Sequence, residues 1–84
     1  MVIGTVIGHA TSTVKHESLA GWRLLVVQPL NAQFKPEADP ILAIDATGAG
    51  SGTRVILSSD GKAARELVGN NKSPVRYFVC GIVD

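Results

Sequence analysis

Cysteine is almost absent from this sequence, and so is any other residue set that could hold a small fold together covalently or through a metal. Cys80 is the only cysteine among 84 residues, so no disulfide can form within the chain. His9 and His16 are the only histidines, and with Cys80 they show no spacing typical of structural zinc ligands. A domain of this size buries only a modest core. Small domains without disulfides or metals are commonly stabilised by oligomerisation, and the apolar content of 45% favours an oligomer here.

Charge is sparse and unclustered. Only 18% of the residues are charged, the formal net charge is +1, and the cations are dispersed along the chain at Lys15, Arg23, Lys35, Arg54, Lys62, Arg65, Lys72 and Arg76. Nucleic acids and anionic membranes are normally bound by clustered basic residues, so we expect neither as a partner. No apolar run is long enough to cross a membrane. The start of the chain also lacks the charged region of a signal peptide, and we therefore expect a cytoplasmic location.

Five segments have the apolar composition and the flanking turn residues that are typical of β-strands. They cover residues 2–11, 22–28, 41–45, 53–58 and 75–83. Gly4 and Gly8 in the first segment suit a strongly curved strand, or one that another backbone approaches closely. The second and fifth segments are apolar on both faces, which predicts that a second subunit covers the outer face.

A short helix is predicted between the fourth and fifth strands. Asp60 is a suitable N-cap residue, and Gly69 suits the position just after the last turn. Ala64, Leu67 and Val68 fall on one face of such a helix. Five short strands and one short helix predict an all-β fold, namely a small, closed or nearly closed barrel of the OB-like kind. No linker or repeat divides the chain, so residues 1–84 are expected to form one domain.

The polar segment from residue 29 to residue 40 interrupts this pattern and contains Phe34. It is predicted to be a protruding loop or the tip of a long hairpin. Two interpretations of Phe34 remain open: it is an exposed contact residue, or it folds back onto the barrel.

The glycine-rich run at residues 48–52 is the most conspicuous local pattern. A phosphate-binding loop would need a G-x-G-x-x-G pattern ahead of a helix, or a Walker lysine. Residues 53–58 instead have the pattern of a strand, so no helix N-terminus is available to hold an anion. We interpret the run as a tight loop whose backbone needs positive φ angles or close approach of another backbone.

Catalytic chemistry has little support. Asp45, Asp60 and Glu66 are scattered carboxylates, and no set of nucleophile, base and orienting group can be assembled from their spacing. Cys80 lies in the most apolar strand, where a buried and inert thiol is expected. We therefore predict neither an enzyme nor a cofactor. An OB-like nucleic-acid or ligand-binding module remains the alternative, although Arg76 beside Tyr77 is its nearest approach to a base-stacking surface.

Five stretches follow one another in a recognisable order: residues 1–8 with 13–15, residues 19–27, the run 45–52 followed by 55–57, residues 61–65 and residues 81–84. This ordered set resembles one known family, the EutN/CcmL proteins of bacterial microcompartments. It implies a five-stranded barrel that assembles into a ring of five. Such pentamers cap the vertices of a polyhedral protein shell, beside hexameric shell proteins, and have no catalytic role. The shell, of a carboxysome or of a catabolic metabolosome, encloses metabolic enzymes within the cytoplasm.

Two sets of residues are then candidates for assembly. The doubly apolar second and fifth strands suggest Leu25, Val27, Phe78 and Ile82 as subunit-interface residues. The glycine-rich loop is expected near the fivefold axis, where small side chains would let five backbones converge; it comprises Thr47, Gly48, Ala49, Gly50, Ser51 and Gly52.

Overall fold

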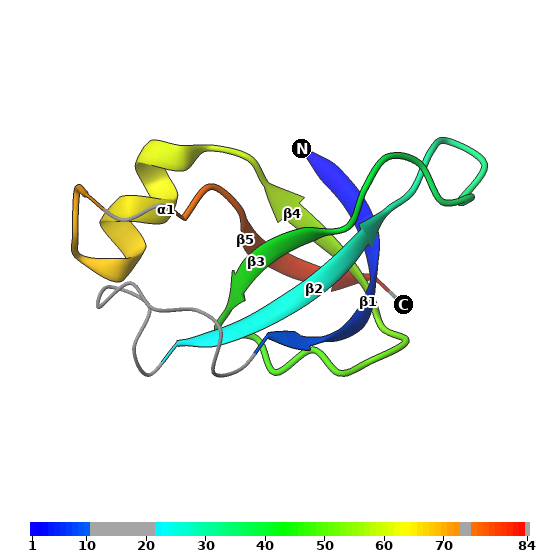
Figure 1. Cartoon of the computed structure of the whole chain (residues 1–84), viewed down its shortest axis with the longest axis horizontal. Helices are drawn as coiled ribbons and strands as arrows, with labels where there is room; N and C mark the ends of the chain where they lie inside the picture. The colour runs from blue at the N-terminus through cyan, green and yellow to red at the C-terminus, as the bar shows by residue number, and fades with distance from the viewer. Residues whose placement is uncertain (11–21, 73–74, 84) are drawn as a thin grey trace.

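Five strands form a closed barrel, and one helix packs against its outside (Figure 1). The computed structural model describes residues 1–10, 22–72 and 75–83; His16 and the resemblance at residues 13–15 and 19–21 lie outside them. The elements are β1 (Val2–Ala10), β2 (Arg23–Pro29), β3 (Ile41–Asp45), β4 (Arg54–Ser58), α1 (Gly61–Val68) and β5 (Phe78–Val83). The predicted all-β class, with five strands and one short helix, is confirmed.

The strands close in the order β1-β2-β3-β5-β4. All neighbouring pairs are antiparallel except β3 with β5, which is parallel. The long strand β1 makes closure possible, because its first half pairs with β4 and its second half with β2. Its register against β2 shifts between Val6 and Gly8, which is the signature of a β-bulge, and bulges bend strands.

Gly4 is required where β1 crosses β2. A Cβ atom at this position would collide with the Val27 side chain and lie 2.8 Å from the carbonyl oxygen of Gln28. The expectation that a glycine in β1 permits close backbone approach is therefore confirmed at Gly4, whereas a Cβ atom at Gly8 would meet nothing within 4 Å.

The barrel interior is filled by small and medium-sized aliphatic side chains. Its buried members come from every strand and from the loop after β3: Val6, Leu25, Val27, Ala43, Ala49, Val55, Leu57 and Val79. Burying a side chain such as Leu25 contributes about 1.5–3 kcal/mol relative to leaving it in water.

A second cluster lies outside the barrel, beneath α1. Leu24 and Ile44 turn outward from β2 and β3 and pack against Ala64 of the helix and against Val75. The outer face of β2 is thus covered at Leu24 by the chain's own helix, which corrects the prediction that another subunit covers all of it. The fifth strand, predicted from residue 75, begins at Phe78, and Val75 ahead of it is buried in this cluster.

The helix begins and ends as predicted. The side chain of Asp60 accepts a hydrogen bond from the backbone N–H of Ala63 at 3.1 Å, and Gly69 adopts a φ of 74° just after the last turn. Of the three residues assigned to its apolar face, Ala64 is buried and Val68 packs on the second cluster. Leu67 shares this face by its spacing but is 44% exposed, so the predicted apolar face is buried only in part.

Candidate functional site

Asp45, the last residue of β3, is buried and organises the glycine-rich loop that follows it. Its side chain has no exposed surface. Oδ1 accepts hydrogen bonds from the backbone N–H of Thr47 at 2.7 Å and from the Thr47 hydroxyl at 2.6 Å. Oδ2 accepts from the backbone N–H groups of Gly48 at 3.1 Å and Ala49 at 3.0 Å. A loop that would otherwise lack regular hydrogen bonding is thereby folded around one carboxylate.

Arg23, the first residue of β2, completes this centre. Residues 23 and 45 are partners in the antiparallel register of β2 and β3, which brings the two side chains together. Arg23 Nη1 donates to Asp45 Oδ2 at 2.8 Å and also to the carbonyl oxygen of Ala49. Its Nη2 lies 2.7 Å from Nε2 of His9 on β1. Arg23–Asp45 is the only ion pair within the described residues. With its contacts to His9 and Ala49, Arg23 links β1, β2, β3 and the loop.

The glycines of the loop serve its tight course. Gly48 and Gly52 have φ angles of 82° and 86°, in the left-handed region that side chains disfavour. The far end of the loop returns to β1, where Gly52 N–H donates to the carbonyl of Val6 at 2.8 Å. The interpretation of this run as a loop that needs positive φ is therefore confirmed. The N–H groups of Gly48 and Ala49 donate to Asp45, and that of Gly52 donates to Val6, so these three amides are occupied and are not free to hold a phosphate.

The charge of Asp45 is stabilised despite its burial. Burial raises the pKa of this carboxyl group, but the hydroxyl of Thr47 and the backbone N–H groups of Thr47 and Ala49 lower it by more. Arg23 adds to the lowering, so the net pKa lies below the ordinary value. Asp45 is therefore an anion in the folded chain at neutral pH.

The four predicted interface residues divide into two groups. Leu25 and Val27 are 0% exposed and line the barrel interior, so a neighbouring subunit cannot touch them and their assignment to an interface is wrong. Phe78 is half-buried against the cluster beneath α1, and Ile82 is 45% exposed. The interface role of these two residues stays a prediction.

Cys80, expected to be buried, is exposed beside the register shift between β4 and β5.

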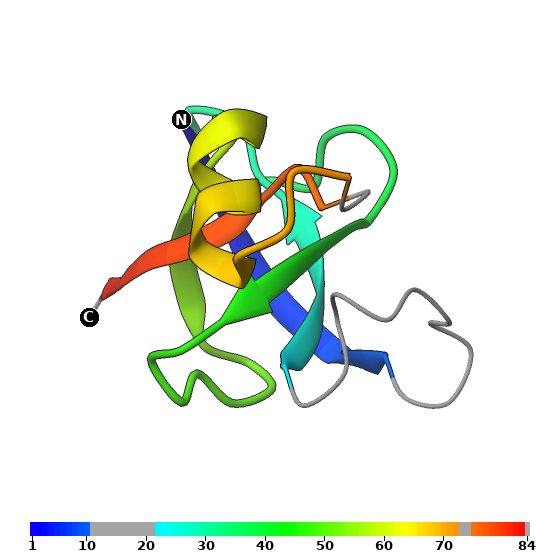
Figure 2. The ribbon, with the colours of Figure 1, turned by 90° about the vertical axis from the view of Figure 1, so that its left-hand side faces the viewer.

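The axis-loop residues lie together at one end of the barrel, between β3 and β4 (Figure 2). Thr47, Gly48, Ser51 and Gly52 are exposed, whereas Ala49 is buried in the core and anchors the loop. In both views this loop lies on the side away from α1. Its position relative to any fivefold axis stays a prediction.

Several exposed apolar side chains on the outer faces of strands had not been singled out. Ile3 and Ile7 of β1 are 37% and 53% exposed, and Leu42 of β3 is 48% exposed. Ile3 stands opposite Ile56 of β4, and Leu42 stands opposite Val26 of β2. Side chains of a strand alternate between its two faces, so Ile3, Thr5 and Ile7 share one face of β1. The two isoleucines at alternate positions were the available signal.

The segment between β2 and β3 is a protruding hairpin loop held by its own polar groups. Asn31 accepts from the backbone N–H groups of Gln33 and Lys35, and Gln28 donates to the carbonyl of Ala38. Phe34 combines the two interpretations left open. Its ring folds back onto Arg54, whose guanidinium carbon lies 4.2 Å from the ring centroid. Phe34 is nevertheless 52% exposed.

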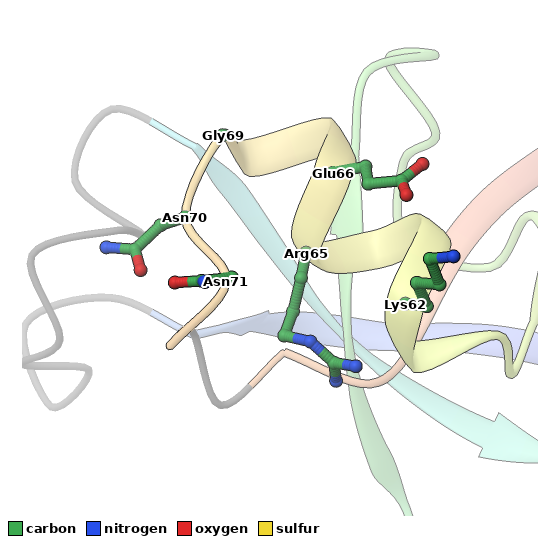
Figure 3. A pocket seen from close by; sticks show the side chains of 6 residues that line it. All are labelled: Lys62, Arg65, Glu66, Gly69, Asn70 and Asn71. Atoms are coloured by element: carbon green, nitrogen blue, oxygen red, sulfur yellow. The ribbon is translucent and has the colours of Figure 1, made fainter.

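Two hollows mark the surface. One, of about 330 Å³, lies between the base of this loop and the start of β1; we call it the acidic hollow, and it is lined by Met1, Val2, Ile3, Pro29, Leu30, Glu37, Ala38, Asp39, Ile41 and Tyr77. The other is a shallow groove of about 710 Å³ at α1 and the turn after it, called the helix groove (Figure 3). The described lining of the helix groove is Lys62, Arg65, Glu66, Gly69, Asn70 and Asn71.

The comparison with known proteins assigns this barrel to a family. The model of the family described as "Ethanolamine utilisation protein EutN/carboxysome" matches residues 1–84. This chain belongs to the EutN/CcmL family.

Relatives of the EutN/CcmL chain include GrpN of Rhodospirillum rubrum, named a bacterial microcompartment shell vertex protein, which is 43% identical over 100% of this chain and 93% of its own length. EutN of Salmonella typhimurium, also named a shell vertex protein, is 42% identical over 100% of this chain and 84% of its own length. CcmL of Gloeobacter violaceus, a carboxysome shell vertex protein, is 37% identical and aligns over 100% of this chain and 83% of its own length.

Solved structures of relatives have the same fold. The GrpN structure from Rhodospirillum rubrum, described as a pentameric microcompartment shell protein, superposes with a TM-score of 0.83 at 40% identity, covering 100% of this chain and 94% of that one. The CcmL structure from Gloeobacter violaceus gives a TM-score of 0.85 at 37% identity, covering 100% and 86%.

Family membership confirms the resemblance found in the sequence. The EutN/CcmL chain is a structural vertex protein of a bacterial microcompartment shell, and its family is not one of enzymes. No helix in the described part of the chain is long and apolar enough to cross a membrane. Among those same residues, no cluster of three or more His, Cys, Asp or Glu could hold a metal ion.

Proposed function

We propose that five copies of this chain close into a ring that caps the vertices of a microcompartment shell, where the ring borders hexameric shell proteins. The observation that carries the proposal is the whole-chain likeness to GrpN, whose solved structure is described as pentameric. Fivefold rings set among sixfold tiles would supply the curvature that closes a shell. Function would then lie in shape and contact surfaces rather than in a reaction.

The surface of the single chain suits such a ring. Ile3, Ile7, Leu42 and Ile82 are each more than a third exposed, an arrangement that favours burial against a partner. A ring contact is heterologous, because one surface of each subunit meets a different surface of the next. Apolar residues on β1, β3 and β5 supply more than one such surface.

The loop from Thr47 to Gly52 is proposed to lie near the fivefold axis. Its density of small side chains supports this position, because five copies of a loop can converge only where side chains are small. Asp45 and Arg23 would hold each copy in a fixed shape before assembly, so that the ring loses little conformational entropy on forming.

The contact with hexamers is tested by co-expressing the chain with hexameric shell proteins and imaging the particles by electron microscopy. Closed polyhedral shells are expected when the chain is present, and open sheets or tubes when it is omitted. Equal yields of closed shells in both cases would refute the vertex role in this system.

A further inference from the structure

The acidic hollow has the chemistry of a site for a long cationic side chain. Its apolar lining includes Ile3, Leu30 and Ile41, while Glu37 and Asp39 supply two carboxylates. Neither carboxylate has an ion-pair partner among the described residues, where Arg23–Asp45 is the only pair. Lys and Arg bury their methylene stems against apolar surface and keep the charged head in a polar place, which is the combination that this hollow offers.

The N-terminal amino group does not neutralise the hollow. Met1 also lines it and contributes a single cation against the two carboxylates. The hollow therefore keeps a net negative charge.

The helix groove has the opposite charge. Lys62 and Arg65 lie on it with one carboxylate, Glu66, and Lys72 follows in the turn beyond Asn71. Figure 3 shows Lys62 and Arg65 projecting from α1, Lys62 on the exposed side of the helix. No ion pair involving Lys62 or Arg65 occurs within residues 1–10, 22–72 and 75–83. These cations are available to a partner.

The two surfaces can act at the same time. Their described linings share no residue. The acidic hollow is formed by the loop base and the start of β1, whereas the helix groove is formed by α1 and the turn after it. One chain could therefore use its hollow toward one neighbour and its helix toward another, which is what a heterologous ring requires.

We propose that Lys62 and Arg65 of one copy dock into the acidic hollow of the next copy. This inference rests on the proposed ring and identifies one pair of surfaces that join its subunits. The occupant is a second copy of this chain, because the same molecule carries both the acidic, apolar hollow and the unpaired cations that match it in charge.

Charge reversal tests this contact. One variant carries Glu37→Lys with Asp39→Lys, a second carries Lys62→Glu with Arg65→Glu, and a third carries all four changes. Each two-residue variant places like charges together at every subunit contact and should raise the dissociation constant of the ring at least about tenfold. The four-residue variant restores opposite charges at every contact and should recover the ring.

Folding and assembly are separated by controls. Arg76→Glu reverses an exposed cation that lines neither surface and should leave the ring intact. Circular dichroism shows whether each variant keeps its fold; should Arg65→Glu prevent folding, the exposed Lys62→Glu alone replaces it, with Glu37→Lys alone as its partner change. Masses are measured by light scattering after size exclusion at several protein concentrations.

The outcomes are distinct. Loss of the ring in both two-residue variants, with recovery in the four-residue variant, supports the docking. The docking is overturned if the wild-type chain forms a ring and both two-residue variants still form it. It is also overturned if the four-residue variant fails to recover the ring. In either case the proposed ring itself stands. A wild-type chain that is itself monomeric overturns the proposed ring.

Discussion

Replacing Asp45 by asparagine should destabilise the folded chain strongly. The carboxylate accepts four hydrogen bonds from the loop and one from Arg23, and its side chain is fully buried. An amide of the same size offers one acceptor oxygen and turns an N–H₂ group toward the remaining donors. Removing one partner of a buried ion pair typically costs about 3–5 kcal/mol. Because the Arg23 side chain is 38% exposed, we expect a value near the lower end, about 3 kcal/mol.

The measurement is urea unfolding followed by circular dichroism, at pH 7. For a domain of this size, a loss of about 3 kcal/mol corresponds to a fall in Tm of more than about 12 °C. Asp60→Asn is the matched control, since asparagine caps a helix as well as aspartate does and should change the free energy of unfolding by less than about 0.5 kcal/mol. An Asp45→Asn variant as stable as this control would refute the role assigned to the carboxylate.

The same residue sets an acid dependence. The pKa of Asp45 is lowered in the folded chain, so its contribution to stability is fully present above the ordinary value of 3.8 and is lost as the pH falls through the lower, folded value. The wild-type chain should therefore lose stability relative to Asp45→Asn as the pH falls below about 4. A constant difference between the two proteins from pH 7 to pH 2 would contradict this assignment.

Two further variants separate folding from assembly. Leu25→Ala removes a fully buried side chain from the barrel interior and should cost about 2–5 kcal/mol in urea unfolding; a loss below about 1 kcal/mol would contradict its placement in the core. Gly50→Leu should leave the single chain folded, because a Cβ atom there meets nothing within 4 Å, yet should prevent the ring if five loops converge; an unchanged oligomer mass by light scattering would remove the loop from the axis.

The elements could be predicted from the sequence because local rules governed them. An aspartate before a short apolar face and a glycine after it are typical of the two ends of a helix, and Asp60 and Gly69 take these positions in the structure. The closed barrel followed from the number and the shortness of the strands. The register shift between Val6 and Gly8 was not predicted, because it depends on which strands pair.

The burial of Leu25 and Val27 could not be predicted, because β2 has an unbroken run of apolar residues. Alternation shows which residues share a face but not which face is inside when both are apolar. The answer depends on α1, which covers Leu24 from outside and leaves Leu25 to the barrel interior.

The role of Asp45 was also hidden, although its position at the end of a strand before a glycine-rich run was visible. The carboxylate is meaningful only beside Arg23, 22 residues earlier in the chain, and that contact depends on the register of β2 against β3. Side-chain to backbone hydrogen bonds of Asp in turns are common, and they were the signal that could have identified it.

The mass of the purified chain in solution tests the central claim most directly. Light scattering after size exclusion should give the mass of five copies of the 8.8 kDa chain, which is 44 kDa. A stable species of 8.8 kDa at micromolar concentration would contradict the proposed ring and would favour a monomeric binding module instead.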